Sequence, residues 1–189
     1  FFFLTLIVSC GGGGGGGDGY SPGTVHCNGT PTEVVEVTNP TTGKTWMDRN
    51  LGASRAAESP TDSEAYGDLF QWGRGADGHQ CRNSSTTSNL SSVDLVSHGD
   101  FIVPPENDFI NNPGRDWRSP QNDNLWQDVN GINNPCPINY RLPTRTEWST
   151  EVSSWTSSNA AGAFFSTLKL SVAGYRRTWQ SNGSLDDVG

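Results

Sequence analysis

The stretch "NPCPINYRLPTRTEW", residues 134–148, constrains the fold of this chain more than any other segment. Thr144 followed three residues later by Glu147 matches a capping box, in which each residue satisfies a free backbone N–H at a helix start. Pro143, just before the cap, stiffens the entry and ends any preceding helix. The pattern predicts a strand-like segment, a rigid corner and a helix beginning near residue 145.

The predicted helix has one apolar face. Trp148, Val152 and Trp155 follow each other at positions i, i+4 and i+7, which lie on one side of a helix. We expect this face, led by Trp148, to enter the core. Leu142 belongs to the strand-like entry, and Arg141 either pairs with a carboxylate to lock the corner or is exposed.

Composition points to a loop-rich globular protein. The 189 residues are only 32% hydrophobic and 17% charged, yet they include seven Trp, eight Phe and four Tyr. Disordered chains are poor in aromatic residues, so we expect a core built from a few large rings. The net charge of −8, without a basic run, excludes nucleic-acid binding, which requires a basic face.

The first residues are typical of an exported bacterial protein. An apolar run over residues 1–8 is too short to span a bilayer but suits the core of a secretory signal. It ends in "LIVSC", which resembles the lipobox of bacterial lipoproteins and makes Cys10 the candidate for acylation. We therefore expect a partial signal peptide at 1–10, a glycine-rich flexible tether at 11–32 and a partial folded domain at 33–189.

Three further segments carry structural predictions. Residues 32–52 predict a hairpin, because apolar Val35 and Val37 alternate with Glu36 before the turn cluster "NPTTGK" and the chain then returns. Residues 64–75, "EAYGDLFQWGRG", predict a buried strand. Residues 75–120 are polar and lack periodicity, which is uncommon over such a length; Trp117 and Trp126 are the rings best placed to pin this region.

The order of several motifs resembles a known family. "GKTWMDRNLGAS", "EAYGDLFQWGR", "DWRSPQNDNLW" and "CPINYRLPTRTEW" occur in sequence. Together they resemble the Fibrobacter succinogenes major paralogous domain family, within the formylglycine-generating-enzyme and sulfatase-modifying fold group. The resemblance covers roughly residue 34 to the end. It implies an α+β, loop-rich, C-type-lectin-like fold that is truncated at its C-terminus, and it implies no defined activity.

The cysteine pairing is open at this level. If Cys10 is acylated, Cys27, Cys81 and Cys136 remain, and the flanking prolines give Cys136 a rigid context suited to a disulfide. One pairing is Cys81–Cys136. The other, implied by the resemblance, joins Cys136 to a closing cysteine that follows in other members of the family.

No convergent catalytic set or metal motif stands out. The oxygen-rich segment 123–133 makes Asp123, Asp128 and Asn130 weak candidates for calcium, although such residues also serve turns. We otherwise expect no cofactor and no metal.

The leading hypothesis is a non-catalytic lipoprotein module that is anchored to the bacterial envelope, at the surface of the outer membrane. We expect it to bind a polysaccharide or a surface protein. Two alternatives stay open. One is an oxygen-dependent enzyme of the formylglycine-generating type, whose catalytic C-terminal part we expect to be missing from this sequence. The other is a purely structural envelope component.

Overall fold

The computed structural model describes residues 10–12, 19–105, 116–177 and 185–188. The predicted signal segment 1–9 lies outside the described residues. Short strands and helices are joined by long irregular segments, in this order: β1 (Gly11–Gly12), β2 (Glu36–Thr38), β3 (Thr45–Met47), the 3₁₀-helix η1 (Ser63–Ala65), β4 (Thr86–Thr87), β5 (Phe101–Ile102), β6 (Tyr140–Arg141), α1 (Arg145–Ser153), α2 (Ala160–Phe165), β7 (Ala173–Arg176) and β8 (Leu185–Val188).

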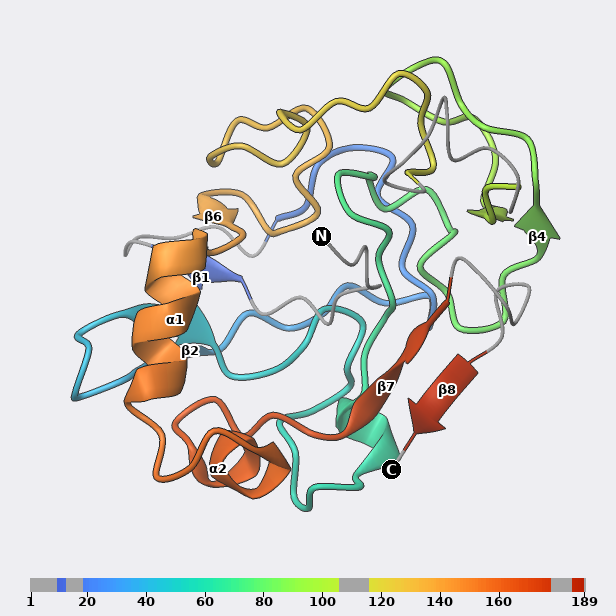
Figure 1. The fold of residues 1–189 in the computed structure, drawn as a ribbon. Coiled ribbons are helices and arrows are strands. Elements are labelled where there is room, and N and C mark those ends of the chain that lie inside the picture. Colours follow the sequence, from blue (N-terminus) through green and yellow to red (C-terminus); the bar gives the residue numbers. More distant parts are fainter. Residues whose placement is uncertain (1–9, 13–18, 106–115, 178–184, 189) are drawn as a thin grey trace.

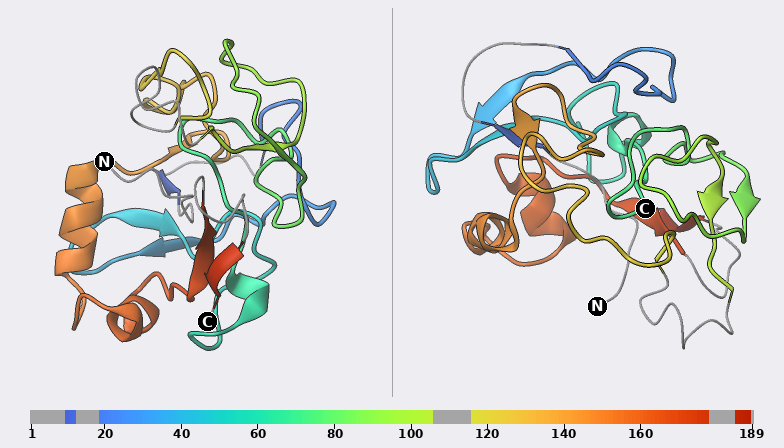
Figure 2. Two further views of the ribbon diagram at one scale, coloured as in Figure 1. Left: turned by 45° about the vertical axis from the view of Figure 1, so that its right-hand side comes forward. Right: turned by 90° about the horizontal axis from the view of Figure 1, so that it is seen from above.

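The strands form three small sheets. The largest has the order β2-β3-β1-β6, and β4–β5 and β7–β8 are separate pairs. Helices α1 and α2 lie on the opposite side of the molecule from the β4–β5 pair (Figures 1 and 2). The structure is thus a mixture of small helices and sheets held together mainly by loops.

The predicted hairpin is confirmed. β2 and β3 pair antiparallel, with Val37 opposite Trp46. Asn39 closes the turn, because its backbone N–H donates to Lys44 O and its side-chain Oδ1 accepts from Thr41 N. The local turn residues therefore place this element correctly.

The start of the glycine tract belongs to the sheet, so the expected tether at 11–32 is wrong for its described residues. Gly11 pairs with both Trp46 and Arg141, on either side of β1. A Cβ at Gly12 would lie 2.6 Å from the Tyr140 ring, so only glycine permits this close approach. Segment 19–32 is attached to the rest of the chain by the hydrogen bonds from Ile138 N to Gly19 O and from Val25 N to Ala76 O. Residues 13–18 lie outside the described part.

Both disulfides differ from the predicted pairing. Cys10 is bonded to Cys136 and Cys27 to Cys81, so the Cys81–Cys136 pairing is wrong. A closing cysteine beyond this sequence is not the partner of Cys136 either. The Cys10 sulfur is fully buried and already has its second bond, so acylation of Cys10 is incompatible with this structure.

The Cys10–Cys136 bond lies in the main core. This cluster also contains two aromatic rings from distant loops, and its buried members are Cys10, Met47, Leu51, Phe70, Trp126, Cys136 and Tyr140. Leu142 packs against its edge. A smaller cluster contains Ile102, Trp117 and Leu125.

The expected strand at 64–75 is wrong, although the segment is buried. It begins as η1 and continues as irregular chain past Gly67, whose φ is +66°. Its backbone hydrogen bonds go to two different segments, from Asp68 N to Leu51 O and from Leu69 N to Gln80 O. The alternation of aromatic residues in this segment therefore predicted its burial correctly, but the segment does not pair with a neighbouring strand.

The two predicted tryptophans pin the long polar region. Trp117 Nε1 donates to Trp72 O at 2.7 Å, and Trp126 Nε1 donates to Arg74 O at 3.1 Å. Both rings are almost fully buried. Each ring thus supplies apolar area to a core and fixes a backbone carbonyl of the segment it covers.

The capping box at α1 is confirmed. Thr144 Oγ1 accepts from Glu147 N, and the Glu147 carboxylate accepts from Thr144 N. Arg141 takes the first of its two alternatives, because its guanidinium donates to both Glu147 oxygens at 2.8 and 2.9 Å. These contacts hold the pKa of Glu147 well below its usual range.

The expectation that Trp148 and Trp155 drive α1 into the core is wrong. Both rings are half-buried, and Trp148 contacts the buried Trp46 edge-on, with ring centroids 6.2 Å apart. The fully buried side chain of α1 is Glu151. Asn39 Nδ2 donates to its two carboxylate oxygens at 2.8 and 2.9 Å, which ties the helix to the hairpin turn.

We expect Glu151→Ala to lower the free energy of unfolding by about 2–3 kcal/mol, because the buried Asn39 amide would lose both carboxylate acceptors and keep only Ser154 Oγ. Glu151→Gln keeps one acceptor oxygen and is the milder control. Thr144→Ala removes only the exposed cap and should cost about 1 kcal/mol. Urea unfolding of the three variants measures this order, and equal losses for Glu151→Ala and Thr144→Ala would contradict the role given to Glu151.

Candidate functional site

A pocket of about 780 Å³ lies where the N-terminal segment meets the irregular chain around residues 63–68. Two other hollows within the described residues are smaller, at about 210 and 310 Å³. The larger volume falls in the range of small-molecule sites. This pocket is therefore the candidate ligand site.

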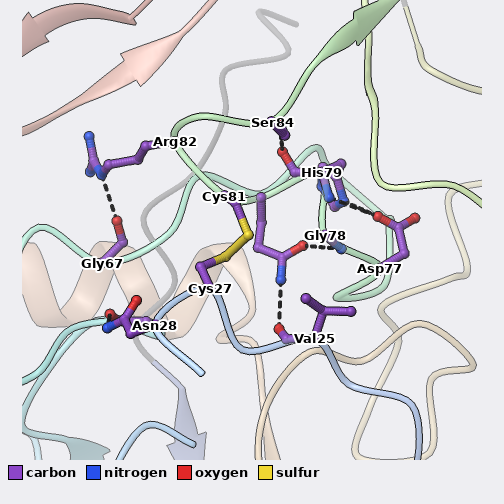
Figure 3. The surroundings of a disulfide bond; sticks show 12 residues. Val25, Cys27, Asn28, Gly67, Asp77, Gly78, His79, Cys81, Arg82 and Ser84 are labelled. Carbon is purple, nitrogen blue, oxygen red and sulfur yellow. Dashed lines mark hydrogen bonds and ion pairs between the residues drawn. A yellow bond between two sulfur atoms is a disulfide. The ribbon is translucent and has the colours of Figure 1, made fainter. Parts of the chain in front are cut away.

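The Cys27–Cys81 disulfide holds the two walls of this pocket together. On one wall, Asn28 Nδ2 donates to Gly52 O at 2.9 Å. On the other, Arg82 Nε donates to Gly67 O at 2.8 Å. Figure 3 shows Asn28, Gly67 and Arg82 on the same side of the disulfide. Segments far apart in sequence are thus fixed around one opening.

Arg82 is fixed in place by backbone carbonyls. Its Nη2 donates to Ala173 O at 2.9 Å and to Tyr66 O at 3.4 Å. Its guanidinium also lies over the Tyr66 ring, 5.4 Å from the centroid. Burial lowers the pKa of Arg82. The N–H groups of Nε and Nη2 are therefore occupied by backbone carbonyls, and the positive charge of Arg82 remains beside the pocket.

Asp68 lines the pocket with a buried carboxylate. Its side chain belongs to a residue that is only 7% exposed, and no described residue donates a hydrogen bond to it. Burial raises its pKa from 3.8 to about 7, and the Arg82 charge opposes that rise. The carboxylate oxygens still reach the pocket, where a ligand or water can donate to them, and burying them without such a donor would be costly.

Gly52 makes room for this carboxylate. Its φ is +83°, and a Cβ there would lie 2.3–2.6 Å from the carboxyl atoms of Asp68. The Gly52 N–H is bound to Thr32 Oγ1 at 2.7 Å and so is not available to Asp68. The nearby Tyr20 hydroxyl donates to Thr32 O, and burial, with a smaller effect of the Asp68 charge, raises the pKa of Tyr20 to about 12.

The remaining polar side chains of the pocket wall offer oxygen and amide groups. They are Thr30, Ser54, Ser63, Glu64 and Asn83. Glu64 is exposed and accepts from Ser54 Oγ at 2.7 Å. With Asp68 ionised, two carboxylates and one guanidinium face the opening, so the pocket carries a net negative charge.

Two buried ionisable side chains elsewhere, Arg74 and His79, have several hydrogen-bond partners. Arg74 is fully buried, yet it donates to Asp77 Oδ2, Gln71 Oε1, Asp100 O and His98 O. His79, which Figure 3 shows beside Asp77, accepts from Gln71 N through Nε2 at 2.9 Å. Burial lowers the pKa of His79 to about 4, consistent with a neutral ring. Asp68 contrasts with these groups.

The sequence-predicted site residues do not line this pocket. Asp123 accepts from Gln121 and Asp128 from Val129 N, while Asn130 is exposed. Among the described residues, no cluster of three His, Cys, Asp or Glu side chains could hold a metal ion. The calcium candidates thus serve local turns.

Sequence reasoning missed Asp68. The available signal was an acidic residue inside the apolar run "AYGDLF", where a solvated carboxylate is not expected.

No protein-family model, curated protein or solved structure matches this chain in comparisons with known proteins. In the part of the chain that the structure describes, no helix combines the length and apolar character needed to cross a bilayer.

Proposed function

We propose that this chain is a non-catalytic ligand-binding module of the bacterial cell envelope, with a C-type-lectin-like fold, and that its ligand is a polysaccharide. The observation that carries the proposal is the unpartnered Asp68 carboxylate in the pocket of about 780 Å³. Sugar hydroxyls are hydrogen-bond donors that a buried acceptor lacks. Membership of the major paralogous domain family rests on the motif order alone.

Export from the cytosol is part of the proposal. All four cysteines form disulfides, which persist in oxidising compartments. The leader-like first residues agree with this location. A lipid anchor on Cys10 would place the domain on the outer-membrane surface, but acylation and the Cys10–Cys136 bond exclude each other in one molecule.

The rival activity, oxygen-dependent formylglycine generation, would need catalytic cysteines other than those of this sequence, because each of these has a disulfide partner. Binding of a surface protein, or a purely structural role, would not require the open pocket at Asp68. Saccharide binding therefore uses the observed geometry best.

We expect the full chain to bind members of a panel of immobilised bacterial polysaccharides. Asp68→Asn should weaken retention at least about tenfold, which corresponds to about 1.4 kcal/mol. Asp128→Asn removes the same charge from an exposed turn outside the pocket and should leave retention unchanged. Failure of the wild-type chain to bind any saccharide, or equal binding by Asp68→Asn, would contradict the proposal.

A further inference from the structure

The Asp68 pocket has a chemical bias that goes beyond saccharide binding in general. Two carboxylates, on Asp68 and Glu64, face the opening, and no described residue donates a hydrogen bond to Asp68. The donors on Arg82 Nε and Nη2 and on the Asn28 amide are directed to backbone carbonyls. A ligand that brings N–H and O–H groups therefore complements the wall better than one that brings acceptors.

The charge of the wall points in the same direction. Asp68 and Glu64 exceed the single Arg82 by one negative charge when both carboxylates are ionised. The Asp68 carboxylate is the more buried of the two, and a charge-assisted hydrogen bond at such a position is stronger than a neutral one. A protonated amine would supply the donors that Asp68 lacks and would balance the charge.

The size of the pocket argues against an amine alone. About 780 Å³ exceeds the needs of a single ammonium group, and the side chains of Thr30, Ser63 and Asn83 lie around the opening. These groups suit hydroxyls carried beside the amine. A bare metal ion is a poorer fit, because the described residues bring no third acidic, His or Cys ligand to this place.

We propose that the pocket recognises an amino sugar unit, with the protonated primary amine on the Asp68 carboxylate and the ring hydroxyls on the surrounding polar side chains. This deepens the proposed saccharide-binding function and rests on the same pocket. N-acetylation of the amine removes its charge and two of its three N–H donors, so the acetylated sugar should be a poor ligand.

The test is calorimetric titration of the full chain with glucosamine and with N-acetylglucosamine at about pH 7 and low ionic strength. We expect glucosamine to bind at least about tenfold more tightly, in line with the gain of one charge-assisted hydrogen bond. Asp68→Asn should remove this preference, whereas Asp128→Asn should keep it. Circular dichroism of both variants verifies that they are folded.

Several outcomes would overturn the inference. Equal affinity for the two sugars, with both lost in Asp68→Asn, would leave a saccharide pocket and reject the amine. Binding of n-butylamine as tightly as glucosamine would reject the role of the hydroxyls. Calcium binding that displaces glucosamine and depends on Asp68 would assign the pocket to a metal ion. No glucosamine binding at all would reject the amino sugar, whatever the polysaccharide panel shows.

Discussion

Replacing Cys10 and Cys136 together by alanine is expected to lower the free energy of unfolding by about 4–5 kcal/mol. The bond joins residues separated by 126 positions, and in the chain-entropy model a loop of this length stabilises by about that amount. A native domain has only about 5–15 kcal/mol in total. Urea unfolding of the oxidised wild type and the double variant measures the difference.

The Cys27 and Cys81 pair provides a matched comparison. It closes a shorter separation of 54 positions, so its double alanine variant should lose about 4 kcal/mol, slightly less than the first. Mapping of peptides without reduction identifies the bonds themselves. A peptide that carries acylated Cys10, together with a free Cys136 thiol, would reject the pairing and restore the lipid anchor. Equal stability of wild type and the Cys10 and Cys136 double variant would reject the size of the effect.

The features that the sequence predicts well are local. The capping box joins residues three apart, and the hairpin turn is closed within six residues, from Asn39 to Lys44. Turn and cap chemistry depends on side chains that contact their own backbone, so a single segment contains the whole signal. Trp117 and Trp126 could also be predicted to anchor the long polar region, because large aromatic rings in a polar segment are expected to be buried in a core.

The features that the sequence does not predict are long-range. Cys10 has its partner 126 residues away, and nothing in the local spacing distinguishes Cys136 from Cys81 as that partner. The buried Glu151 lies three residues after Trp148 and four before Trp155, on the same side of the helix as the apolar stripe, but the stripe does not indicate that a carboxylate is the side chain buried there. Its acceptor role appears only when Asn39, from the hairpin turn 112 residues earlier, is placed beside it.

Asp68 shows the same limitation at the candidate site. Its carboxylate is buried because Gly52 permits a close approach and because the Cys27–Cys81 bond brings two distant walls together. The fold satisfies another deeply buried charge, on Arg74, with four partners. The Asp68 carboxylate receives no such partners from the described chain, so its burial lowers the stability of the fold. Such a loss of stability is common at ligand sites.

Because the Asp68 carboxylate is buried, we expect the free energy of unfolding to depend on pH. Burial raises the folded-state pKa of Asp68 to about 7, above its ordinary 3.8, so between these values the folded chain binds more protons than the unfolded chain. The contribution of Asp68 to stability is therefore highest below about pH 4 and falls as the pH rises toward 7. Three pKa units correspond to about 4 kcal/mol, as an upper value.

Asp68→Asn removes this titration while keeping the shape of the side chain. We expect the variant to match wild type near pH 4 and to exceed it by as much as about 4 kcal/mol at pH 8. Other carboxylates, such as Asp77 with its lowered pKa, contribute equally to both proteins and cancel in the difference. Glu64→Gln, an exposed change in the same pocket, should give no comparable gain in the free energy of unfolding.

Urea unfolding of wild type and both variants from pH 4 to pH 8 measures these differences. A stability gap between wild type and Asp68→Asn that stays constant from pH 4 to pH 8 would show that the Asp68 carboxylate is partnered in solution, and the pocket would then lose the unsatisfied acceptor on which ligand binding depends.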